Sequence, residues 1–202
     1  MDTEILVLDK NWSPHRWIGI EKAIQHEATN EVIDHLGTSI IVYHGGKNRI
    51  TGLQSKIETS SIIVVDGAPN PRKYKEPSLT NLNLFQRDRH ICAYCSRFYR
   101  SVDLTCDHII PTSKGGKDVW MNVVAACRSC NSMKGDLSPG QKMFENPGPQ
   151  GDYMMRPIFV PYVPSKAEHL IMKGRNIKVD QMDFLIEHIT NKDVSRIYKD
   201  FN

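Results

Sequence analysis

The stretch that decides the fold is DHIIPTSKGGKDVWMNVVAACRSCNSMKGD, residues 107–136. An aspartate stands beside a histidine at its start, a polar loop with two glycines follows, and an apolar run then leads into two cysteines separated by two residues. The positions able to carry chemistry are Asp107, His108, Asn122, Cys127, Cys130 and Asn131. Such a cluster belongs either to a zinc-stapled structural knuckle or to a catalytic centre that uses zinc as its frame.

Two short strands and one helix account for this stretch. Residues 104–108 favour a strand, and residues 122–126 favour a second one. Gly115 and Gly116 lie in the loop between them and permit a tight reversal of the chain. Residues 128–134 predict a short helix. This order brings the end of the first strand close to the helix.

The cysteine spacing indicates a zinc ion. The pairs Cys92/Cys95 and Cys127/Cys130 are separated by 31 residues. Four thiolates complete a tetrahedral shell and leave no position for water or substrate, so the predicted site is structural. Because Asn131 follows Cys130 directly, a metal that holds the second pair also positions Asn131.

Two further residues compete with these cysteines as zinc ligands. His90 precedes the first pair and could replace one thiolate, although a histidine there also suits the surface or a contact with phosphate. Cys106, the fifth cysteine, lies in an apolar run, where a free thiol packs as a small hydrophobic group. We therefore expect Cys106 to be a packing residue.

Composition excludes several classes of protein. The chain has 202 residues and a hydrophobic fraction of 40%, enough for a core. No run approaches the roughly 20 apolar residues that span a bilayer, and the opening MDTEILVLDK is too acidic for a signal peptide. Five cysteines are too few and too oddly counted for a secreted disulfide framework. We expect a cytoplasmic protein, in a bacterial cell or a phage-infected host.

Positive charge gathers around the cysteines. Residues 1–71 carry six Lys/Arg against nine Asp/Glu, whereas residues 72–142 carry twelve against six, and residues 143–202 carry eight against eight. A basic region of this kind can offset the repulsion between a protein and phosphate groups. The alternative is a solvated basic face without a partner.

The same three stretches are the predicted domains. Residues 1–71 form an N-terminal α+β region, residues 72–142 the zinc-bound core, and residues 143–202 a C-terminal extension with terminal helices. The linker candidate is GAPNPRKYKEP, residues 67–77, which contains three prolines and a basic cluster.

Periodicity predicts the elements of the flanking stretches. EILVLDKNWSPH favours a strand that ends at a Ser-Pro turn, and WIGIEKAIQHEATNEVI has helical spacing from Ile20 onward. Strands are also predicted for SIIVYH, SSIIVVDG and RPIFVPYVP. Helices are predicted for SLTNLNLFQRD, with Ser78 or Thr80 as its cap, and for VDQMDFLIEHI and DVSRIYKDF.

The predicted turn of the chain lets three polar side chains converge. Asp107 and the side-chain carbonyl of Asn131 are hard oxygen ligands that suit Mg²⁺ or Mn²⁺. The imidazole group of histidine titrates near neutrality in general, so His108 could deprotonate an attacking water. Against this stands a structural interpretation, in which the Asp-His pair supports the fold and Asn131 caps a helix.

Taken together, the motif resembles the HNH endonuclease family in its zinc-containing form. The resemblance rests on Asp107-His108, Asn122, Asn131 and Lys134, bracketed by the two cysteine pairs. VLDKNWSPHRWIGIEKAI, SLTNLNLFQRDRHICAYC and RPIFVPYVP resemble flanking segments of a bacterial and phage subgroup. It implies an α+β fold with a ββα-metal core stapled by a four-cysteine zinc site, a small α+β N-terminal region and a helical C-terminal extension.

The resemblance also implies roles at the site. His108 would be the general base, Asp107 and Asn131 would hold the divalent ion, and Asn122 would brace the loop and the histidine. The family often has histidine where this chain has Asn131, so the metal preference is open. Arg128 and Lys134 would contact phosphate, or either could balance the charge of the thiolates. The reaction implied is phosphodiester hydrolysis that leaves 5′-phosphate and 3′-hydroxyl ends.

The expected function is that of a metal-dependent DNA endonuclease, active alone or as a homodimer. A catalytically silent zinc module that binds nucleic acid and an RNA-directed nuclease are the alternatives. The basic segment from 72 to 100, Arg87 and Arg89 above all, is the predicted contact with the nucleic-acid backbone. The aromatic residues near the cysteines either stack on bases or form a small core; they are Tyr94, Phe98, Tyr99 and Trp120.

Overall fold

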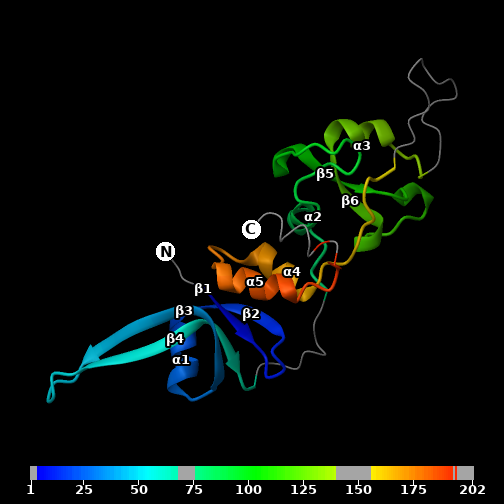
Figure 1. Cartoon of the computed structure of the whole chain (residues 1–202). Helices are drawn as coiled ribbons and strands as arrows, with labels where there is room; N and C mark the ends of the chain where they lie inside the picture. The colour runs from blue at the N-terminus through cyan, green and yellow to red at the C-terminus, as the bar shows by residue number, and fades with distance from the viewer. Residues whose placement is uncertain (1–3, 68–75, 140–155, 193, 195–202) are drawn as a thin grey trace, which may run out of the picture. The chain divides into compact units, whose positions relative to one another are not determined.

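The computed structural model describes residues 4–67, 76–139, 156–192 and 194 (Figure 1). Its chain divides into two compact units. Unit 1 combines Met1–Glu76 with Ser165–Asn202, and unit 2 is Pro77–Pro164. The C-terminal helices thus belong with the N-terminal sheet in space, although they are the last elements of the chain.

A four-stranded sheet organises unit 1, in the order β2-β1-β4-β3. β1 pairs antiparallel with β2 and parallel with β4, and β3 and β4 form an antiparallel hairpin. The strands are β1 (Glu4–Leu8), β2 (Pro14–Gly19), β3 (Val32–Lys47) and β4 (Gln54–Val65). Consecutive apolar residues are buried in β1, from Ile5 to Leu8, and at the end of β4, from Ile62 to Val65, so both faces of the sheet are covered there.

Helix α1 (Ile20–Ala28) packs on this sheet. Its core contacts come from Ala23 and from buried aliphatic residues of the strands, namely Ile5, Val7, Ile18, Ile63 and Val65. The sequence predicts a longer helix, but α1 ends at Ala28 because Asn30 adopts a positive φ of 56°, a left-handed conformation typical of helix termini. β3 then begins at Val32.

Two C-terminal helices complete unit 1, α4 (Lys166–Lys173) and α5 (Val179–Glu187). Helix α5 is predicted by the sequence, whereas α4 is not. Gln181 of α5 is buried, and its side-chain amide donates to the carbonyl oxygens of Glu4 and Ser61 at 2.9 and 2.8 Å. No helix in the described part of the chain has both the length and the apolar character needed to cross a membrane.

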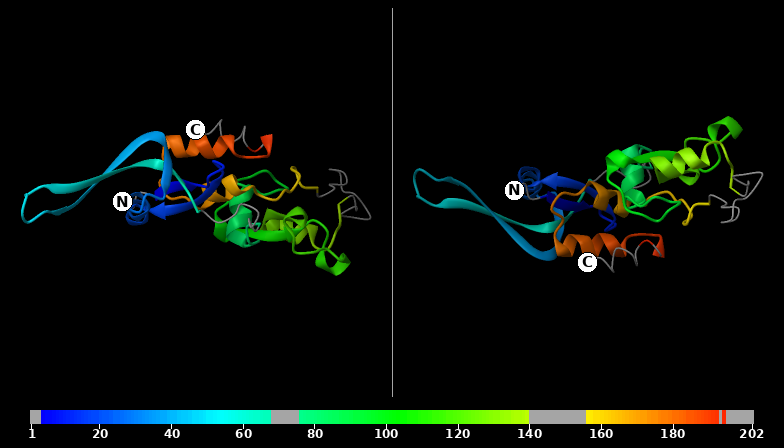
Figure 2. Two further views of the ribbon diagram at one scale, coloured as in Figure 1. Left: turned by 90° about the horizontal axis from the view of Figure 1, so that it is seen from below. Right: turned by 90° about the horizontal axis from the view of Figure 1, so that it is seen from above.

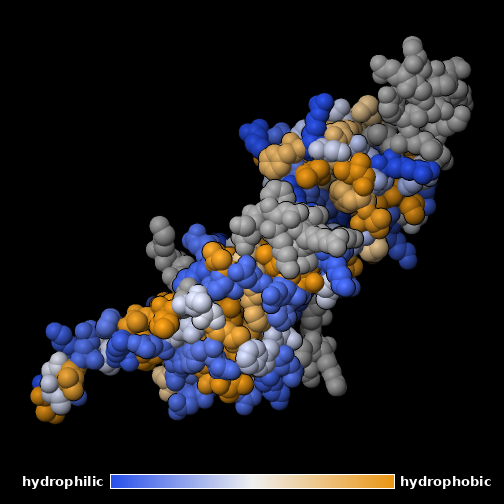
Figure 3. All heavy atoms as spheres, in the orientation of Figure 1, coloured by the Kyte–Doolittle hydropathy of each residue, from blue (hydrophilic) through white to orange (hydrophobic). Residues whose placement is uncertain are grey.

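The β3–β4 hairpin extends beyond the rest of the sheet of unit 1 (Figure 2). β1 pairs only with the end of β4, from Leu6↔Ile62 to Leu8↔Val64, so the other part of β4 has β3 as its partner. The far end of the hairpin carries hydrophobic side chains among hydrophilic ones (Figure 3). We call residues 38–60 the arm.

Unit 2 contains the predicted ββα core. Strands β5 (Leu104–His108) and β6 (Val123–Cys127) pair antiparallel, from Leu104↔Cys127 to His108↔Val123, and helix α3 (Arg128–Lys134) follows directly. Helix α2 (Asn81–Arg87) precedes them, capped by Thr80, whose hydroxyl accepts from the Asn83 amide at 3.2 Å. The predicted α+β fold with its ββα arrangement is confirmed.

One predicted strand is wrong. RPIFVPYVP, residues 156–164, has no strand pairing. It is held instead by separate hydrogen bonds, from the Ile158 amide to the Ala93 carbonyl at 2.8 Å and from the Arg87 guanidinium to the Tyr162 carbonyl at 3.1 Å. Three prolines within nine residues remove the amide donors that a ladder requires. The predicted linker at 67–77 and the predicted helix DVSRIYKDF lie largely outside the described residues.

Candidate active site and metal centre

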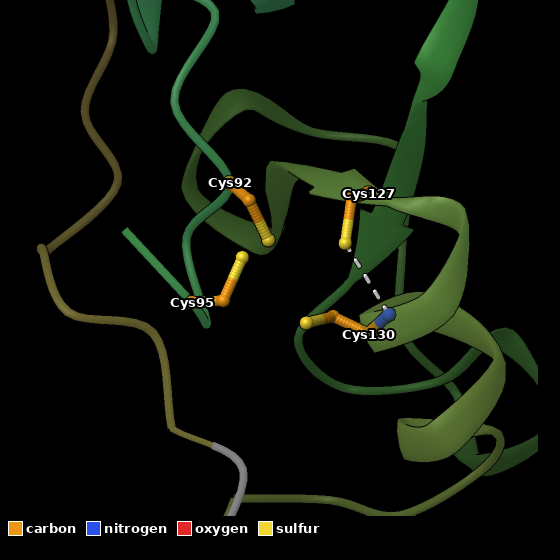
Figure 4. A group of neighbouring side chains, drawn as sticks. All are labelled: Cys92, Cys95, Cys127 and Cys130. Atoms are coloured by element: carbon orange, nitrogen blue, oxygen red, sulfur yellow. Dashed lines mark hydrogen bonds between the residues drawn. The ribbon is translucent and has the colours of Figure 1, made fainter. Parts of the chain in front are cut away.

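The two cysteine pairs meet in unit 2 (Figure 4). Cys92 and Cys95 come from the loop after α2, Cys127 ends β6, and Cys130 lies in the first turn of α3. The four sulfur atoms all lie within 4.8 Å of one another and point toward a common centre. The Cys127 sulfur also accepts from the Cys130 amide at 3.4 Å, which caps α3.

This cluster fits a zinc ion. Tetrahedral coordination at a Zn–S distance of about 2.3 Å separates the sulfurs by about 3.8 Å, close to the arrangement present. Three of the four cysteines are buried, so the shell is closed against water. The predicted convergence of the four thiols is confirmed, and it is consistent with a structural zinc ion. Neither His90 nor Cys106 belongs to the cluster.

The four thiols lie close enough to influence one another's ionisation. Burial would raise the pKa of Cys95, but hydrogen bonds from the Arg97 amide, the Tyr99 hydroxyl and neighbouring thiols lower it to about 7. Burial, and then the adjacent thiol of Cys127, raise the pKa of Cys130. Thiolates this close repel one another, so all four are deprotonated together only around a cation.

Cys106 lies outside this cluster. It packs against the neighbouring hydrophobic core of unit 2. Burial, followed by the charges of Asp118 and Asp107, raises the pKa of its thiol to about 11. A protonated and unreactive thiol agrees with the packing role that the sequence predicts.

Asn131 lies one residue beyond the last cysteine, on α3. Its side-chain amide donates to the Thr105 hydroxyl of β5 at 2.8 Å. This bond leaves the Asn131 carbonyl oxygen as the atom able to bind a metal. The cysteine cluster, the helix and β5 therefore set the position of Asn131 together.

Asp107 is buried, with 4% of its surface exposed. Lys134 donates to one carboxylate oxygen at 2.9 Å, and the Tyr94 hydroxyl donates to the other. Burial and then the hydrogen bond to Asp107 raise the pKa of Tyr94. Each carboxylate oxygen keeps a second lone pair, so Asp107 is held in place and can still accept a cation.

His108 forms a pair with Asp118. The Nε2 atom of His108 lies 2.6 Å from a carboxylate oxygen of Asp118, which comes from the exposed loop between β5 and β6. A carboxylate at this nitrogen favours the tautomer that carries its proton there and leaves Nδ1 as the basic atom. No hydrogen bond to Nδ1 is present among the described residues.

Asn122 bridges that loop at two points. Its carbonyl oxygen accepts from the Ile110 amide at 3.0 Å, and its amide donates to the carbonyl oxygens of Ile110 and Lys117 at 3.1 and 3.0 Å. Gly116 lies against this bridge, because a Cβ atom there would overlap the Ile110 carbonyl oxygen. Asp118 is the next residue after Lys117, so Asn122 positions the partner of His108.

Several of the site residues described above border one cleft of about 180 Å³. Its lining includes Asp107, His108, Asn131 and Lys134. A carboxylate and an amide carbonyl suit a hard divalent ion, and the cleft leaves room for water or phosphate oxygens on it. The residues present therefore fit such an ion, although Lys134 already neutralises much of the Asp107 charge.

A second hollow, of about 440 Å³, adjoins the first through Asn131. It is also lined by Thr105, Arg128 and Ser132. Arg128 is exposed, and its guanidinium donates to the Val102 carbonyl at 3.1 Å. Because Arg128 is exposed beside this hollow, its contact with phosphate stays a prediction.

The predicted contact of Arg87 with nucleic acid is wrong. Only 1% of its surface is exposed, and its guanidinium makes a two-pronged pair with Asp88 at 2.7 and 3.1 Å. It also donates to the carbonyl oxygens of Trp120, Tyr162 and Val123. Burial raises the pKa of Asp88, and Arg87 opposes that shift. Arg87 thus holds unit 2 together from within; Arg89, its predicted companion, is partly buried.

The predicted phosphate contact of Lys134 is also contradicted. Its ammonium is buried, with 2% exposure, and donates to Asp107 and to the His108 carbonyl at 2.9 and 2.7 Å. Lys134 lies in the last turn of α3, which faces β5, so its side chain points inward. It balances the charge of Asp107 rather than that of phosphate or the thiolates.

Replacing Lys134 with methionine should lower the free energy of unfolding by about 3–5 kcal/mol, because the Asp107 carboxylate would stay buried without its cation. Urea denaturation followed by circular dichroism measures the change. The control is Lys117→Met, an exposed lysine in the adjacent loop, which should shift the free energy by less than about 0.5 kcal/mol. Equal stability of the two variants would show that the Asp107–Lys134 pair does not support the fold.

The sequence does not identify two residues of this site. Asp118 is an exposed acid in a glycine-containing loop. The one feature of the sequence that could have identified it is its position in the loop that follows the end of β5. The position of Tyr94 between two cysteines indicates a core packing residue, but its hydroxyl donates a hydrogen bond to Asp107. Of the other aromatic residues, Trp120 is buried in the core, Tyr99 packs against it, and Phe98 is exposed.

A comparison with protein families identifies part of unit 2. Residues 92–141 match the HNH endonuclease family. No curated protein matches the chain. The matched region contains both cysteine pairs, β5, β6 and α3, together with Asp107, His108, Asn122 and Asn131. Residues 92–141 of this chain are an HNH endonuclease domain, a family whose membership implies nuclease activity.

Proposed function

We propose that this protein is a divalent-metal-dependent DNA endonuclease that hydrolyses phosphodiester bonds. The observation that carries the proposal is the single cleft bordered by Asp107, His108 and Asn131, inside the HNH domain and next to the four-cysteine cluster. One base and two oxygen ligands at one cleft are the groups that a single-metal hydrolysis requires.

His108 is the proposed general base. Its Nδ1 atom would take the proton of the attacking water, while Asp118 at Nε2 holds the ring and stabilises the imidazolium that forms. Asn122 acts one step further away, since it fixes the loop that carries Asp118. The pair is analogous to a base and its orienting carboxylate in other hydrolases.

Asp107 and Asn131 are the proposed ligands of a catalytic Mg²⁺ or Mn²⁺ ion. When bound, such an ion polarises the phosphoryl oxygens and stabilises the charge that develops on the leaving oxygen. The Lys134 ammonium already pairs with the Asp107 carboxylate. The electrostatic attraction between Asp107 and a dication is therefore weaker than at an unpaired carboxylate. Arg128, at the adjoining hollow, is the proposed contact with the neighbouring phosphate.

A plasmid assay tests the proposal. Purified protein with Mg²⁺ or Mn²⁺ should convert supercoiled DNA to nicked or linear forms, with half-maximal rate at an ion concentration on the order of millimolar because of the weak site. Gel electrophoresis across an ion titration measures the rate. DNA binding without any ion-dependent cleavage would instead support the catalytically silent zinc module.

The RNA-directed alternative needs a competition experiment. The site contacts the phosphodiester and reads no base, so its residues do not distinguish the two nucleic acids. Duplex DNA and duplex RNA of the same sequence are offered together, and the products of each are quantified. Preferential cleavage of RNA would replace DNA as the substrate while leaving the roles of the residues unchanged.

A further inference from the structure

The arm is a two-stranded ribbon with several hydrophobic side chains on its surface. Along it, Ile40 pairs with Ser60, Tyr43 with Ile57 and Lys47 with Gln54. Residues 40–47 of β3 would span roughly 25 Å at the usual rise per residue. Five of its hydrophobic side chains are exposed, and they are Ile40, Val42, Tyr43, Ile50 and Leu53. An exposed hairpin of this length with apolar side chains on its surface favours aggregation unless it binds a partner.

Charge on the arm differs in sign from the rest of the N-terminal region. Of the six Lys/Arg in residues 1–71, three lie in the arm, whereas none of the nine Asp/Glu lies between residues 35 and 57. The one acid of the arm is Glu58, opposite Val42, and it pairs with Lys56 at 2.5 Å. Lys47 and Arg49 form no ion pair within the described residues. The distal end therefore presents two available cations on an otherwise acidic stretch.

The tip of the arm is ordered around Asn48. Its side-chain oxygen accepts from the amides of Ile50 and Thr51 at 2.8 and 3.0 Å, and its backbone amide donates to the Leu53 carbonyl at 2.8 Å. This turn presents Ile50 to solvent with 95% exposure and Leu53 with 71%. An apolar side chain on a preorganised turn, with cations beside it, can enter a polyanionic groove at a small cost in conformational entropy.

We infer that the arm is a second DNA-binding element, separate from the HNH domain. Lys47 and Arg49 contact phosphates on either side of a groove, and Ile50 contacts the bases at its floor. The identity of the ligand rests on the proposed function. The arm would supply affinity and position on the duplex, whereas the site in unit 2 would supply the chemistry.

Dimensions favour duplex DNA over RNA and over a second copy of the chain. The major groove of B-form DNA is about 12 Å wide and admits a two-stranded ribbon, and apolar side chains beside basic ones also enter the minor groove. The major groove of A-form RNA is too deep and narrow for side chains to read. A second arm would carry the same positive charge, so pairing of two arms would be opposed by repulsion.

The test is a DNA-binding measurement on an arm variant. Fluorescence anisotropy with a labelled duplex of about 30 base pairs, three helical turns, is recorded without added divalent ions so that binding is separated from cleavage. Lys47→Ala combined with Arg49→Ala should weaken binding at least about tenfold at roughly 100 mM salt, and should reduce the slope of log K against log salt by about 2. Ile50→Ser should weaken binding roughly tenfold without changing that slope.

The matched control is Lys10→Ala combined with Lys22→Ala, which removes the same charge from exposed positions of unit 1 off the arm. It should leave the affinity within about twofold of the unchanged protein. An arm variant with unchanged affinity and slope, absence of DNA binding by the full chain, or an arm variant that alters the oligomeric mass in light scattering would each overturn the inference. Plasmid cleavage is measured separately. If the protein cleaves DNA but the arm variants bind normally, the proposed nuclease function stands and the inference about the arm fails. If binding depends on the arm but no cleavage occurs, the inference about the arm stands and the proposed nuclease function fails.

Discussion

The His108→Ala variant should cleave supercoiled DNA about a hundred- to ten-thousandfold more slowly than the unchanged protein. General-base catalysis contributes a factor of this size, and water activation at the proposed site depends on one imidazole. His108 borders the cleft and bonds to the exposed Asp118, so its removal leaves no buried charge unpaired. The measurement is the initial rate of plasmid nicking at saturating Mg²⁺ or Mn²⁺.

Two further variants separate catalysis from structure. Asp118→Asn keeps the shape of the loop but removes the charge that stabilises the imidazolium, so the rate should fall less, by roughly tenfold. His35→Ala replaces an exposed histidine of unit 1 and should leave the rate unchanged. If His108→Ala retained the full rate with a normal zinc content, another residue would have to activate the water.

Loss of a zinc ligand should unfold unit 2. Binding of zinc by four thiolates supplies on the order of 10 kcal/mol to a small domain, which exceeds the net stability of most domains. Cys127→Ser would also remove the sulfur that caps α3 and would release Asn131 from its position. We expect the isolated variant to lose its zinc and the circular dichroism of the folded ββα core.

Elemental analysis should find one zinc ion for each unchanged chain. A strong chelator should produce the same loss of structure as Cys127→Ser, and added zinc should reverse it. Cys106→Ser is the matched control, because this cysteine lies in the same unit but outside the cluster, and it should keep both the zinc and the fold. A Cys127→Ser protein that retained its zinc and its thermal midpoint would exclude the four-thiolate site.

The ββα core follows from local sequence pattern. The two C-x-x-C pairs require a common centre for their sulfurs, and the apolar runs on either side of the glycine loop have the length of paired strands. The predicted strand 104–108 and helix 128–134 have the bounds of β5 and α3, and the second strand differs by one residue. Asp107, His108 and Asn131 meet because these short elements leave few other arrangements.

Other features depend on partners far away in the sequence. Helix α4 carries a local signal that the prediction does not use: Ser165 caps it by accepting from the amide of Glu168, three residues later. No local signal, however, assigns the C-terminal helices to the N-terminal sheet. That assignment depends on contacts such as the bond from the Gln181 amide to the Ser61 carbonyl.

The sequence by itself determined the convergence of the two cysteine pairs, the ββα order and the meeting of Asp107, His108 and Asn131 at one cleft, because each is encoded by spacing within a few tens of residues. Only the tertiary structure decided which basic residues face solvent. Arg87 and Lys134 belong to the basic segment by composition, yet each neutralises a buried aspartate, whereas Lys47 and Arg49 project from an arm in an acidic region. A charge has the same sign in any position, but whether it can meet phosphate depends on the side chains that the fold places around it.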